Sequence, residues 1–166
     1  MAMKKLAAIF LLGVLGTAGT GEAVADKTVS RDEVLKAIAV FQADPSSRRG
    51  ADAAETIFTF AKTSNAVRVS LSHAVAPWMK KKDAPDADTR GMLLAAYVAG
   101  NLDAQLKSGK NSDDVYAGWL QVLATYAQLL AINPAAKISE VEELKNKEAD
   151  GKLQAYAEEV GNSQKR

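Results

Sequence analysis

The 166-residue chain contains no cysteine. Disulfides, thiolate zinc sites, iron–sulfur clusters, cysteine-linked haem and a lipid-modified cysteine are therefore excluded. Histidine occurs only once, at His73, which rules out a metal site built from several imidazoles. Its neighbours Ser70 and Ser72 are too close in sequence to form a triad by spacing alone. The sequence also lacks a G-x-S-x-G elbow and a Gly-rich phosphate loop. We expect no cofactor, no metal and no catalytic residue.

An excess of charge of one sign is also missing. The chain has 21 Lys and Arg residues against 20 Asp and Glu residues. Nucleic acids and anionic membranes attract proteins with a basic surplus. The balance therefore predicts no nucleic-acid partner, and it favours a protein or peptide over a membrane surface as the partner.

Long hydrophobic runs are scarce, and the clearest one lies near the N-terminus at residues 6–15. Two lysines precede it, and the small-x-small sequence AVA follows it and ends at Ala25. These three parts predict a secretory signal peptide, residues 1–25, that is cleaved from a periplasmic or secreted protein. The run is shorter than the roughly 20 residues of a membrane-spanning helix, and no later segment is expected to reach that length.

Cleavage would leave a chain without net charge, because Lys and Arg fall from 21 to 19 and Asp and Glu from 20 to 19. Apolar residues at helical spacing, separated by turn formers, are abundant in this part. Residues 26–160 are predicted to form one all-α domain of five to six helices in antiparallel hairpins, followed by a disordered tail, residues 161–166. The helices are expected to begin at Ser30 and near Asp52, to cover residues 89–107 and 113–132, and to end with one that begins at Ser139.

Two of the predicted helix starts carry a capping box. In this motif a serine and a glutamate three residues later satisfy each other's free backbone N–H groups. The pairs are Ser30 with Glu33 and Ser139 with Glu142. Between them, Gly100 and the alanines beside it are small enough to let a second helix approach closely.

The clearest apolar stripe lies in residues 113–132. Its members recur at the spacing of one helix face, which we expect to point into the core. They are Tyr116, Trp119, Leu120, Leu123, Tyr126, Ala127 and Leu130.

Residues 65–76 fit two structures. Val67, Val69 and Leu71 alternate as in a strand, whereas Val67, Leu71 and Val75 also fit a helix. Because a lone strand would have no evident partner for its backbone groups, we favour a helix that ends before Pro77.

The stretch ATYAQLLAINP, residues 124–134, resembles the second helix and closing proline of a tetratricopeptide repeat. The first-helix pattern of that repeat is missing at the required offset, and no second copy follows at a period of about 34 residues. The resemblance implies helical hairpins, in a compact bundle or a short array of this kind, and assigns no family.

Four aromatic residues are the leading candidates for a ligand-binding site. Tyr97 lies on one predicted helix, and Tyr116, Trp119 and Tyr126 lie on the next, so that they face each other if the helices pair. Such a cluster can line a groove for a peptide or an apolar ligand. Aromatic residues at helical spacing also form packed cores, and both interpretations stay open.

A second candidate is Trp78 with Lys80, Lys81 and Lys82. A tryptophan beside three lysines can contact a membrane interface or a partner, with the ring in the headgroups and the ammonium groups near phosphates. The alternative is a solvated connector in which Trp78 closes the core. Three following aspartates cancel the positive charge locally and favour this alternative.

The sequence therefore predicts a non-catalytic, periplasmic or secreted helical protein that binds a protein or peptide partner. A carrier of a small apolar ligand or lipid is one alternative, and it requires an enclosed cavity. A periplasmic inhibitor or immunity-type protein is another. An interaction protein is expected instead to expose an apolar patch or groove.

Overall fold

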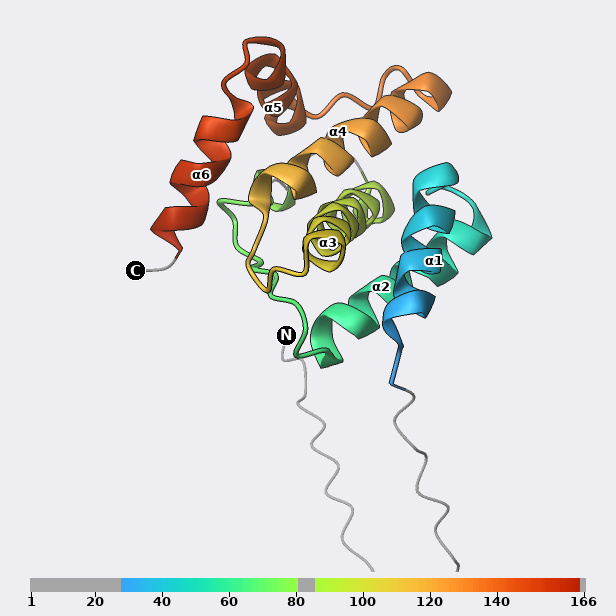
Figure 1. Ribbon diagram of the computed structural model, residues 1–166. Helices are drawn as coiled ribbons and strands as arrows, with labels where there is room; N and C mark the ends of the chain where they lie inside the picture. The colour runs from blue at the N-terminus through green and yellow to red at the C-terminus, as the bar shows by residue number, and fades with distance from the viewer. Residues whose placement is uncertain (1–27, 81–85, 165–166) are drawn as a thin grey trace, which may run out of the picture.

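The computed structural model describes residues 28–80 and 86–164, and in these residues the chain is all-helical, without a strand (Figure 1). The all-α prediction is confirmed. The predicted signal peptide, Lys81 and Lys82 lie outside the described residues. The elements are α1 Arg31–Ala43, α2 Arg48–Thr63, the 3₁₀ turn η1 Pro77–Met79, α3 Ala87–Ser108, α4 Val115–Ile132, α5 Ser139–Ala149 and α6 Leu153–Ser163.

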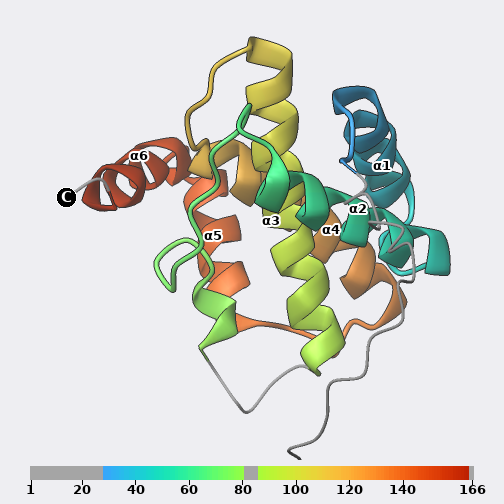
Figure 2. The ribbon, with the colours of Figure 1, turned by 90° about the horizontal axis from the view of Figure 1, so that it is seen from below.

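The helices pack as a compact bundle around α3 and α4. These two helices lie against each other through the middle of the molecule. The α1–α2 pair packs on the α3 side, and α5 and α6 pack on α4, as the two perpendicular views show (Figures 1 and 2). The core is therefore continuous through α3 and α4 from one flanking pair to the other.

The backbones of α3 and α4 come into direct contact at two glycines. A Cβ atom added to Gly100 would lie 2.4 Å from the carbonyl oxygen of Ala117, and one added to Gly118 would lie 2.6 Å from the Tyr97 ring. Only glycine fits at such distances. The expectation that Gly100 admits a second helix is confirmed, and that helix is α4.

The sequence signals for helix starts were confirmed at α1 and were wrong at α2 and α5. The capping box of α1 is present, with Ser30 N–H donating to Glu33 Oε2 at 2.8 Å. The second helix begins at Arg48, with Ser47 as its cap, rather than near Asp52. The capping box predicted at Ser139 is wrong, because the N-cap of α5 is Ile138, whose side chain is buried and makes no cap hydrogen bond.

The C-terminal segment also differs from the prediction. Gly151, with φ of 68°, divides the single expected helix into α5 and α6. The helix then continues to Ser163, so that the disordered tail predicted for residues 161–166 is wrong for residues 161–164. Burial of Leu153, Ala157 and Val160 on one face explains why α6 is ordered to its end.

Helix α4 buries a different face from the one predicted. The buried positions are Val115, Gly118, Trp119, Val122, Thr125 and Tyr126. Trp119 and Tyr126 of the predicted stripe are buried, and Tyr116, Leu123 and Leu130 are partly buried and pack against the core, whereas Leu120 and Ala127 are exposed. The error arises because a glycine and a threonine occupy core positions: Gly118 makes room for Tyr97, and Thr125 is bonded by Gln121 Nε2 at 3.3 Å.

Helix α4 also corrects the expectation that no later segment could span a membrane. Its 18 residues include no charged side chain, and by length and composition they are sufficient to cross one. One-third of the helix is buried, and it packs against α3, α5 and α6. A core helix of a globular domain meets the same criterion.

Two substitutions in α3 test the contact with α4. Gly100→Ala gains helix propensity but places a methyl group on the α4 backbone, and we expect a net loss of about 1–3 kcal/mol of unfolding free energy. Gly91→Ala is the matched control, because a Cβ there meets nothing within 4 Å. It should add up to about 1 kcal/mol. Urea unfolding measures both, and equal stabilisation by the two alanines would contradict the close contact.

Candidate functional site

Three of the four predicted aromatic residues lie in the core. Tyr97 and Trp119 are 0 % exposed and Tyr126 is 2 % exposed. Trp119 Nε1 donates to the Val75 carbonyl oxygen at 2.7 Å, and the hydroxyl of Tyr126 accepts from the Ile138 N–H at 2.9 Å. Helices α3 and α4 pair as expected, but these rings fill the space between elements rather than lining an open groove.

Trp78 and Lys80, from the second predicted site, are not arranged as a tryptophan–lysine anchor at a membrane interface. Trp78 is 1 % exposed, so that its ring is packed in the core and does not reach a headgroup layer in this conformation. Lys80 is exposed, and so is His73. This placement of Trp78 corresponds to the alternative in which it closes the core.

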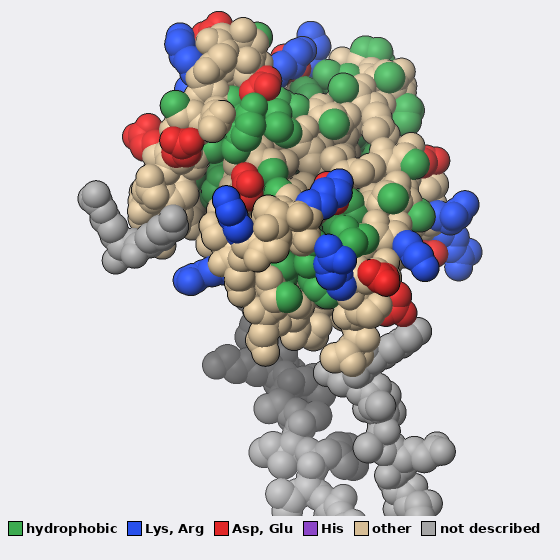
Figure 3. All heavy atoms as spheres, viewed as in Figure 1, with side chains coloured by type: hydrophobic (Ala, Val, Ile, Leu, Met, Phe, Trp, Pro, Cys, Tyr) green, Lys and Arg blue, Asp and Glu red, His purple; other side chains and the backbone are tan. Residues whose placement is uncertain are grey.

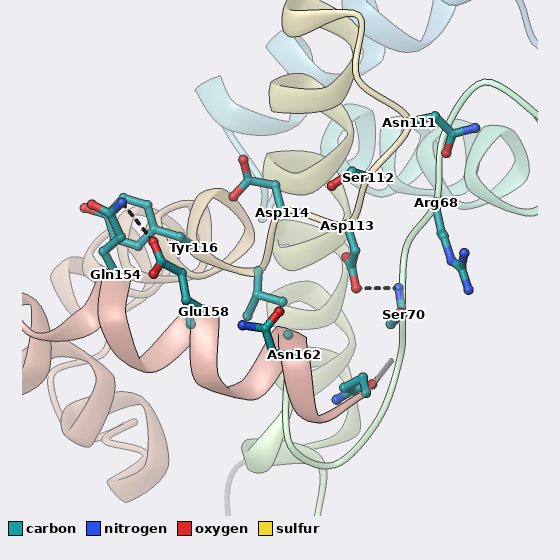
Figure 4. Close-up of a pocket in the computed structure, with 14 residues that line it drawn as sticks. Arg68, Ser70, Asn111, Ser112, Asp113, Asp114, Tyr116, Gln154, Glu158 and Asn162 are labelled. Atoms are coloured by element: carbon teal, nitrogen blue, oxygen red, sulfur yellow. Dashed lines mark hydrogen bonds between the residues drawn. The ribbon is translucent and has the colours of Figure 1, made fainter. Parts of the chain in front are cut away.

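Tyr116, the fourth aromatic residue, is half-buried and lines a polar pocket of about 680 Å³ (Figure 4). Three segments that are distant in sequence form its walls. These are the extended chain at Arg68 and Ser70, residues 111–116 at the start of α4, and one side of α6 together with Gln164, the residue that follows it. Sequence analysis missed this pocket because no single segment contains its pattern.

A buried pair of amides holds the first two walls together. Asn101 and Gln105, one turn apart on α3, are 0 % and 3 % exposed. Gln105 accepts from the Arg68 N–H at 2.9 Å and donates to the Arg68 carbonyl at 2.8 Å. Asn101 donates to Asp113 Oδ1 at 2.5 Å and accepts from the Asp114 N–H at 3.1 Å. Buried polar groups with partners on both sides fix the geometry of a loop.

These contacts correct the prediction of a helix at residues 65–76. The segment is neither helix nor strand, and residues 67–72 run without regular secondary structure. Its backbone finds side-chain partners instead, because Gln105 bonds Arg68 and Asp113 Oδ2 accepts from the Ser70 N–H at 3.2 Å. The argument against an extended chain failed because those partners lie 37 and 43 residues away.

The charge on the pocket wall is mainly negative. Asp113 and Asp114 lie on one side and Glu158 on α6 lies on another, whereas Arg68 is the one basic residue in the lining. Figure 4 shows the Arg68 side chain on the far side of the extended segment from Asp113. A cationic group in the pocket would therefore meet more carboxylates than basic side chains.

An apolar surface begins at the rim of this pocket and follows the solvent side of α4. None of its residues is charged. Leu120 and three alanines are exposed, whereas Tyr116, Leu123 and Leu130 are partly buried and also pack against the core. Figure 3 shows hydrophobic side chains gathered over α4 and in the angle between α4 and α5. We call this surface the α4 outer face, and it consists of Tyr116, Leu120, Leu123, Ala124, Ala127, Leu130 and Ala131.

Polar residues border the α4 outer face on both sides. Towards α1, Gln121 accepts from Gln42 Nε2 at 2.9 Å, and Gln128 donates to the Gln42 carbonyl at 3.0 Å. Towards α5, the Tyr116 hydroxyl lies 3.5 Å from Glu148 Oε1. An exposed apolar surface with a polar border is typical of a protein-interaction site.

Comparison with protein-family models, with curated proteins and with solved structures finds no match for this chain. Among the residues that the structure describes, no group of three or more His, Cys, Asp or Glu side chains is placed to hold a metal ion. The candidate site consists of an apolar face and a polar pocket that share Tyr116.

The amide pair predicts where the pocket is most sensitive to mutation. Gln105→Ala removes both partners of the Arg68 backbone, and we expect a loss of about 1–3 kcal/mol of unfolding free energy with faster hydrogen exchange at the Arg68 amide. Gln154→Ala is the control, because this exposed side chain lines the pocket but bonds Glu158 on its own helix rather than Arg68. Unchanged exchange at Arg68 in Gln105→Ala would contradict the proposed anchoring role.

Tyr97 predicts a dependence of stability on alkaline pH. Burial raises its pKa well above the usual value, and the negative charge of Asp113 raises it further. The unfolded chain loses this proton near pH 10 while the folded chain keeps it, so that stability is complete below about pH 10 and falls as the pH rises.

We expect Tyr97→Phe to reduce this fall, which amounts to at most about 1.4 kcal/mol per pH unit for one tyrosine. The slope should not vanish, because burial also raises the pKa of Tyr126. Urea unfolding at pH 8, 10 and 11 measures the slope. Parallel curves for the wild type and Tyr97→Phe would contradict the assignment.

Proposed function

We propose that this protein is a non-catalytic, periplasmic or secreted interaction module that binds a protein partner through the α4 outer face. The observation that supports it most is that α4, an 18-residue helix without a charged side chain, keeps apolar residues on its solvent side as well as in the core. Leu120 on this face is 37 % exposed. A contiguous apolar surface of this kind is stabilised when a partner covers it and removes it from water.

A carrier of a small apolar ligand fits the geometry less well. Such a protein needs an enclosed, mainly apolar cavity. The pocket beside α6 opens to solvent, and amide, hydroxyl and carboxylate groups make up much of its lining. Tyr97 and Trp119, which would have lined a cavity for the ligand, are packed in the core. An inhibitor or immunity-type protein would be a special case of the interaction module and would use the same face.

Native mass spectrometry of the mature protein, released gently from its own host, tests the proposal. We expect a mass increment that matches another polypeptide. An increment of a few hundred daltons, or one gained only on addition of host lipid extract, would instead identify a carrier. A doubled mass would show that a second copy covers the face.

The complex found in this way should depend on the α4 outer face. Leu120→Lys would place a charge in the apolar contact, and we expect the affinity to fall about tenfold or more. Because Leu120 is partly exposed, the change in folding stability should stay near 0.5 kcal/mol. Leu71→Lys is the matched control, since Leu71 is 56 % exposed and belongs to the extended segment rather than to the α4 outer face. Equal affinities for the two variants would contradict the proposed face.

A further inference from the structure

The α4 outer face and the polar pocket form one continuous surface. Tyr116 belongs to both, because it is the first residue of the face and also lines the pocket. Glu158 and Gln154 on α6 stand across from it (Figure 4). A partner that covers the face and extends past Tyr116 therefore enters the pocket.

The two parts of this surface differ in charge. From Tyr116 to Ala131 the α4 outer face carries no charge, whereas the pocket presents Asp113, Asp114 and Glu158. Asp113 is held in place by Asn101 and by the Ser70 N–H, so that this carboxylate is already positioned before a partner arrives. Fixed charges need no reordering on binding and therefore discriminate between partners by charge.

We propose that the occupant is an amphipathic helix of a partner protein, whose apolar stripe lies along α4 and whose end next to Tyr116 carries lysine or arginine. The inference rests on the proposed function and names the class of partner. Tyr116 and Leu130 are 14 residues apart, which corresponds to a helix of about 21 Å or four turns. Helices that place an apolar stripe in a groove are a common form of protein recognition.

A second copy of the chain fits the charge pattern less well. Helix α4 has no basic residue to offer, so that two copies joined face to face by α4 would set the pocket carboxylates against an uncharged helix. A basic end on the partner removes this mismatch. It also gives the partner helix a defined direction along α4, with the basic end at the N-terminus of α4.

Two synthetic peptides of 15 residues test this assignment. Both carry leucines at helical spacing, and they differ only in three residues at one end, which are lysines in the first peptide and glutamates in the second. Fluorescence anisotropy with the mature protein at low salt measures their affinities. We expect the lysine peptide to bind about tenfold more tightly, with the difference shrinking as salt screens the charges.

Glu158→Lys locates the effect in the pocket, and Glu159→Lys is its matched control. Both residues are exposed on α6 and both substitutions change the net charge equally, but only Glu158 lines the pocket. Reversal of one exposed charge should weaken the lysine peptide about three- to tenfold in Glu158→Lys and leave it nearly unchanged in Glu159→Lys. Circular dichroism confirms that both variants fold.

The outcomes separate this inference from the proposed function. If Leu120→Lys weakens both peptides while Glu158→Lys and Glu159→Lys behave alike, the face stands and the basic partner is overturned. If the two peptides bind equally well to the wild type, the basic partner is overturned as well. If Leu120→Lys affects neither peptide, or neither binds at millimolar concentration, the α4 outer face itself is overturned.

Discussion

The contact between the α3 and α4 backbones is the constraint on which the rest of the structure depends. Gly100 and Gly118 bring the helices so close that no other residue fits at either position. This contact places the Tyr97 ring over Gly118 and directs Trp119 towards Val75, where its indole holds the chain before η1. The α1–α2 pair and the α5–α6 pair then pack on opposite sides of a fixed centre. Exposure of one side of α4 is a consequence, because the flanking pairs leave that side open.

The pocket depends on α3 in a different way. Gln105 replaces the hydrogen bonds that a neighbouring strand would give to the extended segment, and Asn101, one turn away, holds the residues before α4. Two side chains on one helix therefore set the distance between two of the three walls. The third wall, α6, is attached through Gly151 and bonds the extended segment through Gln164 and Ser72. The pocket thus brings together segments whose positions all depend on the same core.

The sequence alone predicted the features that depend on interactions between residues close together in the chain. The all-α class and the Ser30 capping box follow from spacings of three and four residues, which sequence contains directly. The same signal at Ser139 failed because burial of Ile138 decides where α5 begins. The inner face of α4 was misplaced by one position, since Gly118 counts as core only when Tyr97 on another helix is known. The extended segment and the pocket depend on partners far away in sequence, which no local pattern records.

The composition of α4 has a further consequence during synthesis, before any of these contacts exist. An exported chain passes through a membrane channel unfolded, and an 18-residue segment without charge is long enough to be retained in the lipid. Gln121, Thr125 and Gln128 interrupt this segment at intervals of three or four residues. In the folded protein, two of them, Gln121 and Gln128, connect α4 to Gln42 of α1. If the chain is exported as proposed, the three polar side chains would lower the segment's affinity for lipid and favour its release from the membrane.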